Sequence, residues 1–185
     1  ASPTARRQHC IRLEAEAEKV EWEDLKSLVD FIYLAAHGRY MEDGSIQGMF
    51  EMLRIPYLGS KVFASALGMD KIIQRHVLNA EGIDTPKYTS FSVEEIDDFV
   101  KNETMILERI EQAGIKFPIV IKPSKEGSSL GISILKNKNG LKEALHDAAY
   151  LYRQKPHPII IEEKIEGMEF TCIIITDPIT GEPIP

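Results

Sequence analysis

The chain has 185 residues, of which 43% are hydrophobic and 28% charged, as in a globular protein that buries a core. Its formal net charge of −7 argues against nucleic acid as the main partner, because phosphate backbones need a basic protein face. There is no apolar run of the ~18 residues that a membrane span needs, and no signal peptide is recognisable. The two cysteines, Cys10 and Cys172, lie far apart in the sequence. We therefore expect a cytoplasmic protein without a disulfide framework and without a membrane partner.

Hydrophobic periodicity and turn residues divide the chain into helices and strands. Helices are expected, in chain order, at 14–26, 45–54, 62–68, 70–80, 92–101, 103–113 and 140–152. Strands are expected at 30–36, 85–91, 118–122, 132–136, 159–164 and 169–176, and a turn at 177–181. From residue 118 onward the order strand, loop, strand, helix, strand, strand predicts a mostly antiparallel sheet with helices on one face. A domain boundary is expected either just before Met69 or near the strand at 85–91.

The segment 119–132 is the most informative part of the sequence. An apolar run ends at a lysine, a loop rich in serine and glycine follows, and a second apolar run begins. Backbone N–H groups, hydroxyls and the lysine cation could together bind an anion such as a polyphosphate. The contributing residues are Lys122, Ser124, Gly127, Ser128 and Ser129. The spacing G-x-x-x-x-G-K-[ST] does not occur, which excludes a P-loop. An ordinary hairpin turn with an exposed lysine at the strand end is the alternative.

Two further groups have a functional and an ordinary interpretation. Lys71 lies in the first turn of an expected helix, where a cation opposes the helix dipole and a bound polyphosphate would offset it; pairing with Asp70 or solvation would do the same. Glu162 and Glu169 bracket a strand–turn–strand whose backbone at 163–165 is expected to be free to bond an adenine edge. A carboxylate such as Glu169 could accept from two ribose hydroxyls. The alternative for this acidic run is a solvated face.

A third group follows the first expected strand. His37, Glu42 and Asp43 lie just after the run 30–36, and ligands of open sheets gather at the carboxyl ends of strands. The alternative is a polar turn with Asp43 and Gly44 at its apex.

Several of these segments together resemble one known family. The segments are H-G-R-Y-M-E-D-G-S-I-Q-G at 37–48, I-P-Y-L-G-S at 55–60, A-S-A-L-G-M-D-K at 64–71, the loop after Lys122, and E-E-K-I-E-G-M-E-F-T at 162–171. Their order and spacing are similar to those of the D-alanine–D-alanine ligases, which belong to the ATP-grasp superfamily. The resemblance covers about residues 31–176. Met41 departs from it, because it stands where the family usually has glycine.

The resemblance implies an α/β fold of the α+β ATP-grasp type. Residues 31–68 would belong to an N-terminal substrate-binding domain, and 69–185 would form the N-terminal portion of the ATP-grasp domain. Residues 1–30 stay unplaced. The C-terminal part of the family's fold, with its metal carboxylates, is expected beyond Pro185. The chain is thus expected to be an incomplete piece that does not turn over by itself.

The implied activity is ATP-dependent ligation of two D-alanines through an acyl phosphate, for peptidoglycan precursor synthesis. ATP with Mg²⁺ (or Mn²⁺) would be the cofactor, and ATP and D-alanine the partners; a homodimer is left open. The implied ATP-binding residues are Lys71, Lys122, Ser124, Gly127, Ser128, Ser129, Glu162, Glu163, Lys164, Ile165 and Glu169. Ser128 would also orient the reacting groups, while His37 and Glu42 would line the amino-acid side. The alternatives are another carboxylate–amine or depsipeptide ligase that uses D-lactate or D-serine, and a nucleotide-binding fragment without catalysis.

Overall fold

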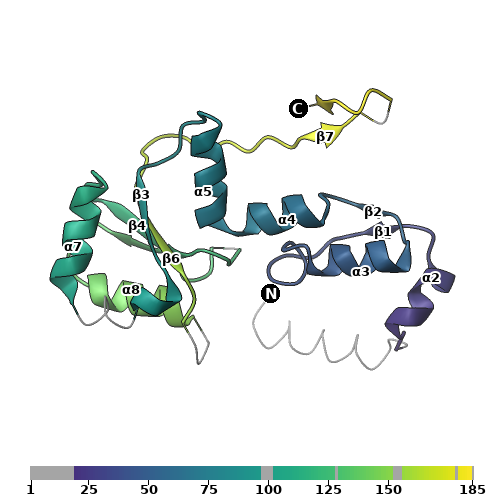
Figure 1. Cartoon of the computed structure of the whole chain (residues 1–185), viewed down its shortest axis with the longest axis horizontal. Coiled ribbons are helices and arrows are strands. Elements are labelled where there is room, and N and C mark those ends of the chain that lie inside the picture. The colour runs from purple at the N-terminus through teal and green to yellow at the C-terminus, as the bar shows by residue number, and fades with distance from the viewer. Residues whose placement is uncertain (1–18, 97–101, 128, 152–155, 178, 185) are drawn as a thin grey trace. The chain divides into compact units, whose positions relative to one another are not determined.

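The structure is a computed structural model that describes residues 19–96, 102–127, 129–151, 156–177 and 179–184. The chain divides into two compact units (Figure 1). The first unit consists of Ala1–Ala80 and Ser124–Leu130, and the second of Glu81–Pro123 and Gly131–Pro185. The phosphate-loop candidate at 124–130 therefore packs with the first unit, although it connects two strands of the second.

The first unit contains mainly helices around a small parallel sheet. Its elements are the 3₁₀ helix η1 (Trp22–Asp24), α2 (Leu25–Leu28), β1 (Ile32–Tyr33), α3 (Ser45–Leu53), β2 (Tyr57–Leu58), α4 (Val62–Met69) and α5 (Lys71–Ala80). β1 pairs with β2 in parallel. The expected buried strand at 30–36 was wrong in length and in burial, because only two residues pair and Tyr33 is 71% exposed. Of the helix expected at 14–26, the described residues contain only η1 and part of α2.

Helix α3 shows how local chemistry sets the ends of an element. It begins after Gly44, whose φ of +91° is left-handed and whose added Cβ would lie 2.7 Å from the Val62 carbonyl oxygen. Only glycine fits there without a shift of the backbone. The helix ends at Arg54, also left-handed with φ of 56°. Phe50, on its buried face, packs on Tyr57 of β2 with ring centroids 5.8 Å apart. The i, i+3, i+4, i+7 spacing thus predicts this helix correctly.

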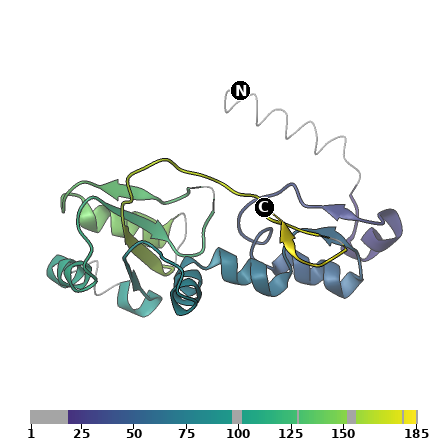
Figure 2. The same cartoon turned by 90° about the horizontal axis from the view of Figure 1, so that it is seen from above.

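The second unit is an antiparallel sheet with helices on one face (Figure 2). The strands are β3 (Tyr88–Phe91), β4 (Ile119–Pro123), β5 (Ser133–Leu135) and β6 (Ile159–Glu163), in the spatial order β3-β6-β4-β5. Helices α7 (Glu103–Gln112) and α8 (Leu141–Tyr150) pack on the sheet, and β7 (Ile175–Thr176) pairs with β8 (Pro183–Ile184). This is the mixed α/β architecture that the sequence predicts.

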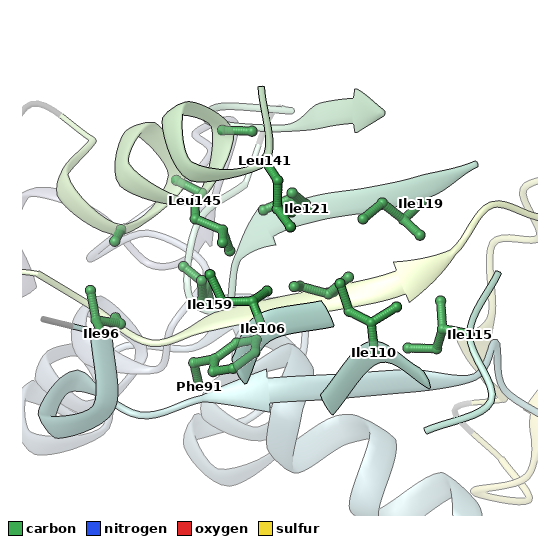
Figure 3. Packing of buried hydrophobic residues seen from close by; sticks show 14 residues of the cluster. Phe91, Ile96, Ile106, Ile110, Ile115, Ile119, Ile121, Leu141, Leu145 and Ile159 are labelled. Carbon is green, nitrogen blue, oxygen red and sulfur yellow. The ribbon is translucent and has the colours of Figure 1, made fainter. Parts of the chain in front are cut away.

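The core of the second unit lies between the sheet and these two helices (Figure 3). On β4, Ile119 and Ile121 point into it and meet Ile106 of α7 and Leu145 of α8, all four no more than 1% exposed. Burying each such side chain contributes about 1.5–3 kcal/mol relative to leaving it in water. Since strand side chains alternate between faces, the same register turns Lys122 toward the opposite face of the sheet.

The expected strand at 169–176 was wrong over most of its length. Only Ile175 and Thr176 form β7, and the preceding residues Met168 and Phe170 are 83% and 85% exposed. The apolar run predicts a strand, but a strand forms only where a neighbour supplies hydrogen bonds, and within the described residues β8 pairs with the last two alone. The N-terminal half of the helix expected at 92–101 is present, and residues 97–101 lie outside the described part. No described helix has the length and apolar character needed to cross a membrane.

Candidate functional site

Lys122 and Glu162 form a buried ion pair on the second unit's sheet. Val120 of β4 lies opposite Glu162 of β6, and Lys122 lies opposite Ile160, so lysine and glutamate are diagonal neighbours on one face. The Lys122 ammonium contacts the Glu162 carboxylate, with side chains only 16% and 5% exposed. A lysine at the end of a buried strand needs such a partner, because an unpaired buried charge is costly. The pair holds a cation where β4 leads into the loop at 124–130.

The segment after Glu162 differs in part from the expectation of a free backbone. Glu163 donates its N–H to the Lys87 carbonyl and accepts the Lys87 N–H on its side chain, both at 2.9 Å. Lys164 donates its N–H to the Pro118 carbonyl at 3.0 Å. The expectation that 163–165 is free was therefore wrong for these two donors, which the sheet edge already uses. Ile165 is 64% exposed, and Glu169 lies on the exposed segment that follows.

In the first unit, the loop at 124–130 is held at the start of α5. The N–H of Lys71 donates to the Ser124 carbonyl at 2.9 Å. The Lys71 ammonium donates to the carbonyls of Glu126, at 2.5 Å, and Ser124, at 3.5 Å. The Lys71 cation at the helix N-terminus is thus partly offset by carbonyl oxygens of the loop. The structure therefore brings Lys71 into contact with the loop, 53 residues away in the sequence.

The serines of the loop differ in their surroundings. Ser124 is fully buried, and within the described part of the chain its hydroxyl has no hydrogen-bond partner. It can reach a ligand only if the loop moves. Ser129 is exposed with φ of 59°, as in a tight turn. Ser128, the predicted catalytic residue, lies outside the described residues. Gly131 closes the loop with φ of +69°, and a Cβ there would come within 2.9 Å of the Pro123 ring.

The turn at 37–43 uses most of its polar groups to hold its own shape. Glu42 accepts the Gly38 N–H at 2.6 Å and contacts His37 Nδ1 at 3.4 Å. Asp43 accepts the N–H groups of Tyr40 and Ser45 at 2.9 and 3.0 Å. Partial burial by itself raises the pKa of Asp43, but these hydrogen bonds outweigh it and the net pKa is lowered. The polar-turn interpretation therefore describes Asp43 well.

The departure at Met41 does not strain this turn. The left-handed residue is Tyr40, with φ of 69°, and Met41 is not among the residues with positive φ. Gln47 of α3 donates to the Met41 carbonyl at 2.8 Å and fixes the backbone there. Met41 is accommodated because the left-handed position of this turn is Tyr40 and not Met41.

The loop and the turn lie against each other in the first unit. A Cβ built on Gly127 would be 3.6 Å from the Glu42 carboxylate and 3.8 Å from the Gly38 Cα, which is ordinary contact distance. The first unit therefore brings together three predicted groups: Lys71, the loop at 124–130 and the turn at 37–43. These are the groups that the resemblance assigns to the phosphate and amino-acid sides of one cleft.

Sequence reasoning gave Asp70 no role beyond pairing with Lys71. In the structure Asp70 accepts the N–H groups of Ile72 and Ile73 and pairs with Lys125 of the loop at 3.1 Å. An aspartate directly before a helix is a preferred N-cap, and this signal was present in the sequence. Across the described ranges, no three His, Cys, Asp or Glu side chains gather in a way that could hold a metal ion.

Family models described as D-ala D-ala ligase N-terminus and C-terminus match residues 3–60 and 77–182. A D-alanine–D-alanine ligase of Carboxydothermus hydrogenoformans is 40% identical over 150 residues, covering 81% of this chain and 45% of its own length. The chain spans less than half the length of the curated relatives it matches.

Solved structures agree with these matches. The D-alanine–D-alanine ligase of Bacillus anthracis complexed with ATP is 33% identical, with a TM-score of 0.61, over 80% of this chain and 45% of that one. The VanG D-Ala:D-Ser ligase of Enterococcus faecalis is 34% identical, with a TM-score of 0.62, over 75% of this chain and 37% of that one.

Proposed function

Because the chain belongs to the D-alanine–D-alanine ligase family, we propose that it supplies the ATP-binding part of an enzyme that joins two D-alanines. In the complete reaction, the carboxylate of one D-alanine attacks the γ-phosphate of ATP, giving an acyl phosphate and ADP. The amino group of the second D-alanine then attacks the acyl carbon, forms the amide bond and expels inorganic phosphate. The product is a dipeptide for peptidoglycan precursor synthesis, and a cytoplasmic location is part of this proposal.

The observation that carries the proposal is the buried Lys122–Glu162 pair directly before the loop. A cation that is already held on a rigid strand can neutralise phosphate oxygens with little further loss of side-chain entropy on binding. Lys71 at the start of α5 would add a second cation, and the loop would cover the phosphates with its N–H groups. The backbone at Ile165 would meet adenine and Glu169 the ribose hydroxyls.

The remaining assignments are proposed from the resemblance of the sequence to this family. The matches of the two family models, ending at residue 60 and beginning at residue 77, support residues 31–68 as part of a substrate domain and 69–185 as part of an ATP-grasp domain. His37, Glu42 and Ser128 would lie on the amino-acid side of the site. Mg²⁺ or Mn²⁺ would neutralise phosphoryl charge in the whole enzyme, but the described residues hold no cluster that fits a metal.

Titration calorimetry of ATP into the chain tests the nucleotide site. Lys122→Ala removes a charge-assisted contact, so the expected loss of binding free energy is about 2–3 kcal/mol. The matched control is Lys138→Ala, an exposed lysine on the same unit, which should bind like the wild type. Since Lys122→Ala also removes the partner of Glu162, the double variant Lys122→Met/Glu162→Gln keeps the interior neutral and should fold yet bind ATP poorly. Equal affinity in wild type and both Lys122 variants would refute the assignment.

Two alternatives to D-alanine as the second substrate are D-serine and D-lactate. The likeness to the D-Ala:D-Ser ligase of Enterococcus faecalis makes D-serine the competitor of D-alanine, and a depsipeptide ligase would use D-lactate. Specificity of this kind can depend on one contact. Competition assays of the full-length enzyme with D-alanine, D-serine, D-lactate and L-alanine should show D-alanine preferred. A preference for an L-amino acid would overturn the family's substrate class for this protein.

A further inference from the structure

Asp70 engages both of its carboxylate oxygens, and each holds a different part of the first unit. Oδ1 accepts the N–H groups of Ile72 and Ile73, at 3.1 and 3.3 Å, and so caps α5. Oδ2 lies 3.1 Å from the Lys125 ammonium of the loop, and the Asp70 side chain is only 15% exposed. One carboxylate thus links the start of a helix to a loop 55 residues further along.

The residue next to Asp70 completes this link. Lys71 donates its N–H to the Ser124 carbonyl and its ammonium to the Glu126 carbonyl. Two consecutive residues of the first unit therefore hold three consecutive loop residues, 124–126. The negative charge of Asp70 at the helix N-terminus also offsets the unfavourable placement of the Lys71 cation there.

We propose that Asp70 is a positioning residue for the loop at 124–130, acting through Lys125 and through the first turn of α5. It fixes the loop relative to Lys71, so that a nucleotide meets a loop that is already in place. The effect on nucleotide rests on the function proposed above, whereas the link between Asp70 and the loop does not. Preorganisation of this kind raises affinity by reducing the ordering that binding must otherwise impose.

Two substitutions distinguish the contact of Asp70 with Lys125 from its cap on α5. Asparagine caps helices about as well as aspartate, so Asp70→Asn keeps the cap on α5 and removes only the charge that attracts Lys125. Lys125→Met removes the same pair from the loop side. The exposed residues Asp84 and Lys138 provide matched controls, as Asp84→Asn and Lys138→Met.

Hydrogen exchange of the loop amides, measured without nucleotide, tests the link itself. Asp70→Asn and Lys125→Met should each raise exchange at residues 124–127 by about threefold, as expected for loss of a partly exposed ion pair. The double variant should show no further increase, because both changes remove one interaction. The control variants should exchange like the wild type. Wild-type exchange in both single variants, or an additive double variant, would overturn the proposal.

The affinity for ATP provides a second measurement. Loss of loop positioning and simple electrostatics predict changes of opposite direction in the Kd of Asp70→Asn. Removing a negative charge near a polyphosphate tightens binding if charge alone matters. Loss of loop positioning weakens it, and we expect about a threefold weaker Kd for Asp70→Asn. Tighter or unchanged binding would overturn the role in nucleotide binding. If Lys122→Ala and wild type bind ATP equally while loop exchange responds to Asp70→Asn, the nucleotide function fails and the loop link stands.

Discussion

Removing the lysine from the buried Lys122–Glu162 pair should destabilise the second unit strongly. The Glu162 side chain is only 5% exposed and that of Lys122 is 16% exposed, so neither charge can be rehydrated without moving the sheet. Breaking a buried pair by removing one partner costs about 3–5 kcal/mol. Lys122→Met keeps the aliphatic stem and removes the ammonium, so the expected loss in the free energy of unfolding lies in that range.

Urea unfolding followed by far-UV circular dichroism measures this loss. The partly exposed pair of Lys125 with Asp70, in which the lysine is 58% and the aspartate 15% exposed, supplies the control, and Lys125→Met should cost less than about 1 kcal/mol of unfolding free energy. The double variant Lys122→Met/Glu162→Leu replaces both charges by apolar groups and should recover to within about 1 kcal/mol of wild type. If Lys122→Met lost less than about 1 kcal/mol, or if the double variant were as unstable as the single, the desolvation argument would be refuted.

Three further predictions concern other parts of the molecule. Gly131→Ala should lower the free energy of unfolding by about 2 kcal/mol or more, because the new Cβ would lie 2.9 Å from a proline ring and the left-handed backbone disfavours alanine. Gly140 is also left-handed but has open space around it, so Gly140→Ala should lower it by only about 1 kcal/mol. Equal urea midpoints for the two variants would contradict this prediction. Burial and the Glu51 carboxylate raise the pKa of Tyr57 to about 12. Because the folded state holds this proton more tightly than the unfolded state, the free energy of unfolding should fall as the pH rises from about 10 to 12. Urea titrations at alkaline pH should show this fall in the wild type and not in Tyr57→Phe. Amides at 124–131 should exchange more slowly with ATP bound than without it, because the loop must open to admit the nucleotide. Identical exchange in both states would contradict the proposal that this loop covers the phosphates.

The sequence predicted elements whose signals are local. Helix α3 follows from its apolar spacing, and the helix expected at 70–80 corresponds to α5 (Lys71–Ala80). The helix expected from residue 92 starts with the capping-box spacing Ser92-x-x-Glu95, in which the Ser92 N–H donates to the Glu95 carboxylate at 2.8 Å. The family and the α/β fold class were also correctly recognised from ordered motifs. These features depend on neighbours a few residues apart, which a single sequence displays directly.

Features that depend on distant partners could not be predicted in this way. The run at 169–176 has the composition of a strand, but only its last two residues find a neighbour. The donors of Glu163 and Lys164 are used by Lys87 and Pro118, strand-edge residues far away in the sequence. The pairing of Lys122 with Glu162 depends on the register between β4 and β6. The roles of the predicted ATP-binding side chains stay predictions until nucleotide binding is measured.

The strand order of the second unit has a consequence for how the chain folds. β6, the last of the four strands in sequence, lies in an inner position between β3 and β4. The β4–β5 pair joins neighbouring segments of the chain and can form early in folding. β3 can pair only after β6 is available, and the Lys87–Glu163 contact beside it joins residues that are 76 apart in the sequence. Closing so long a loop costs entropy before the contacts reward it. During synthesis, β3 and the face of α7 that packs on it are therefore expected to lack their sheet partner until residue 163 has been made.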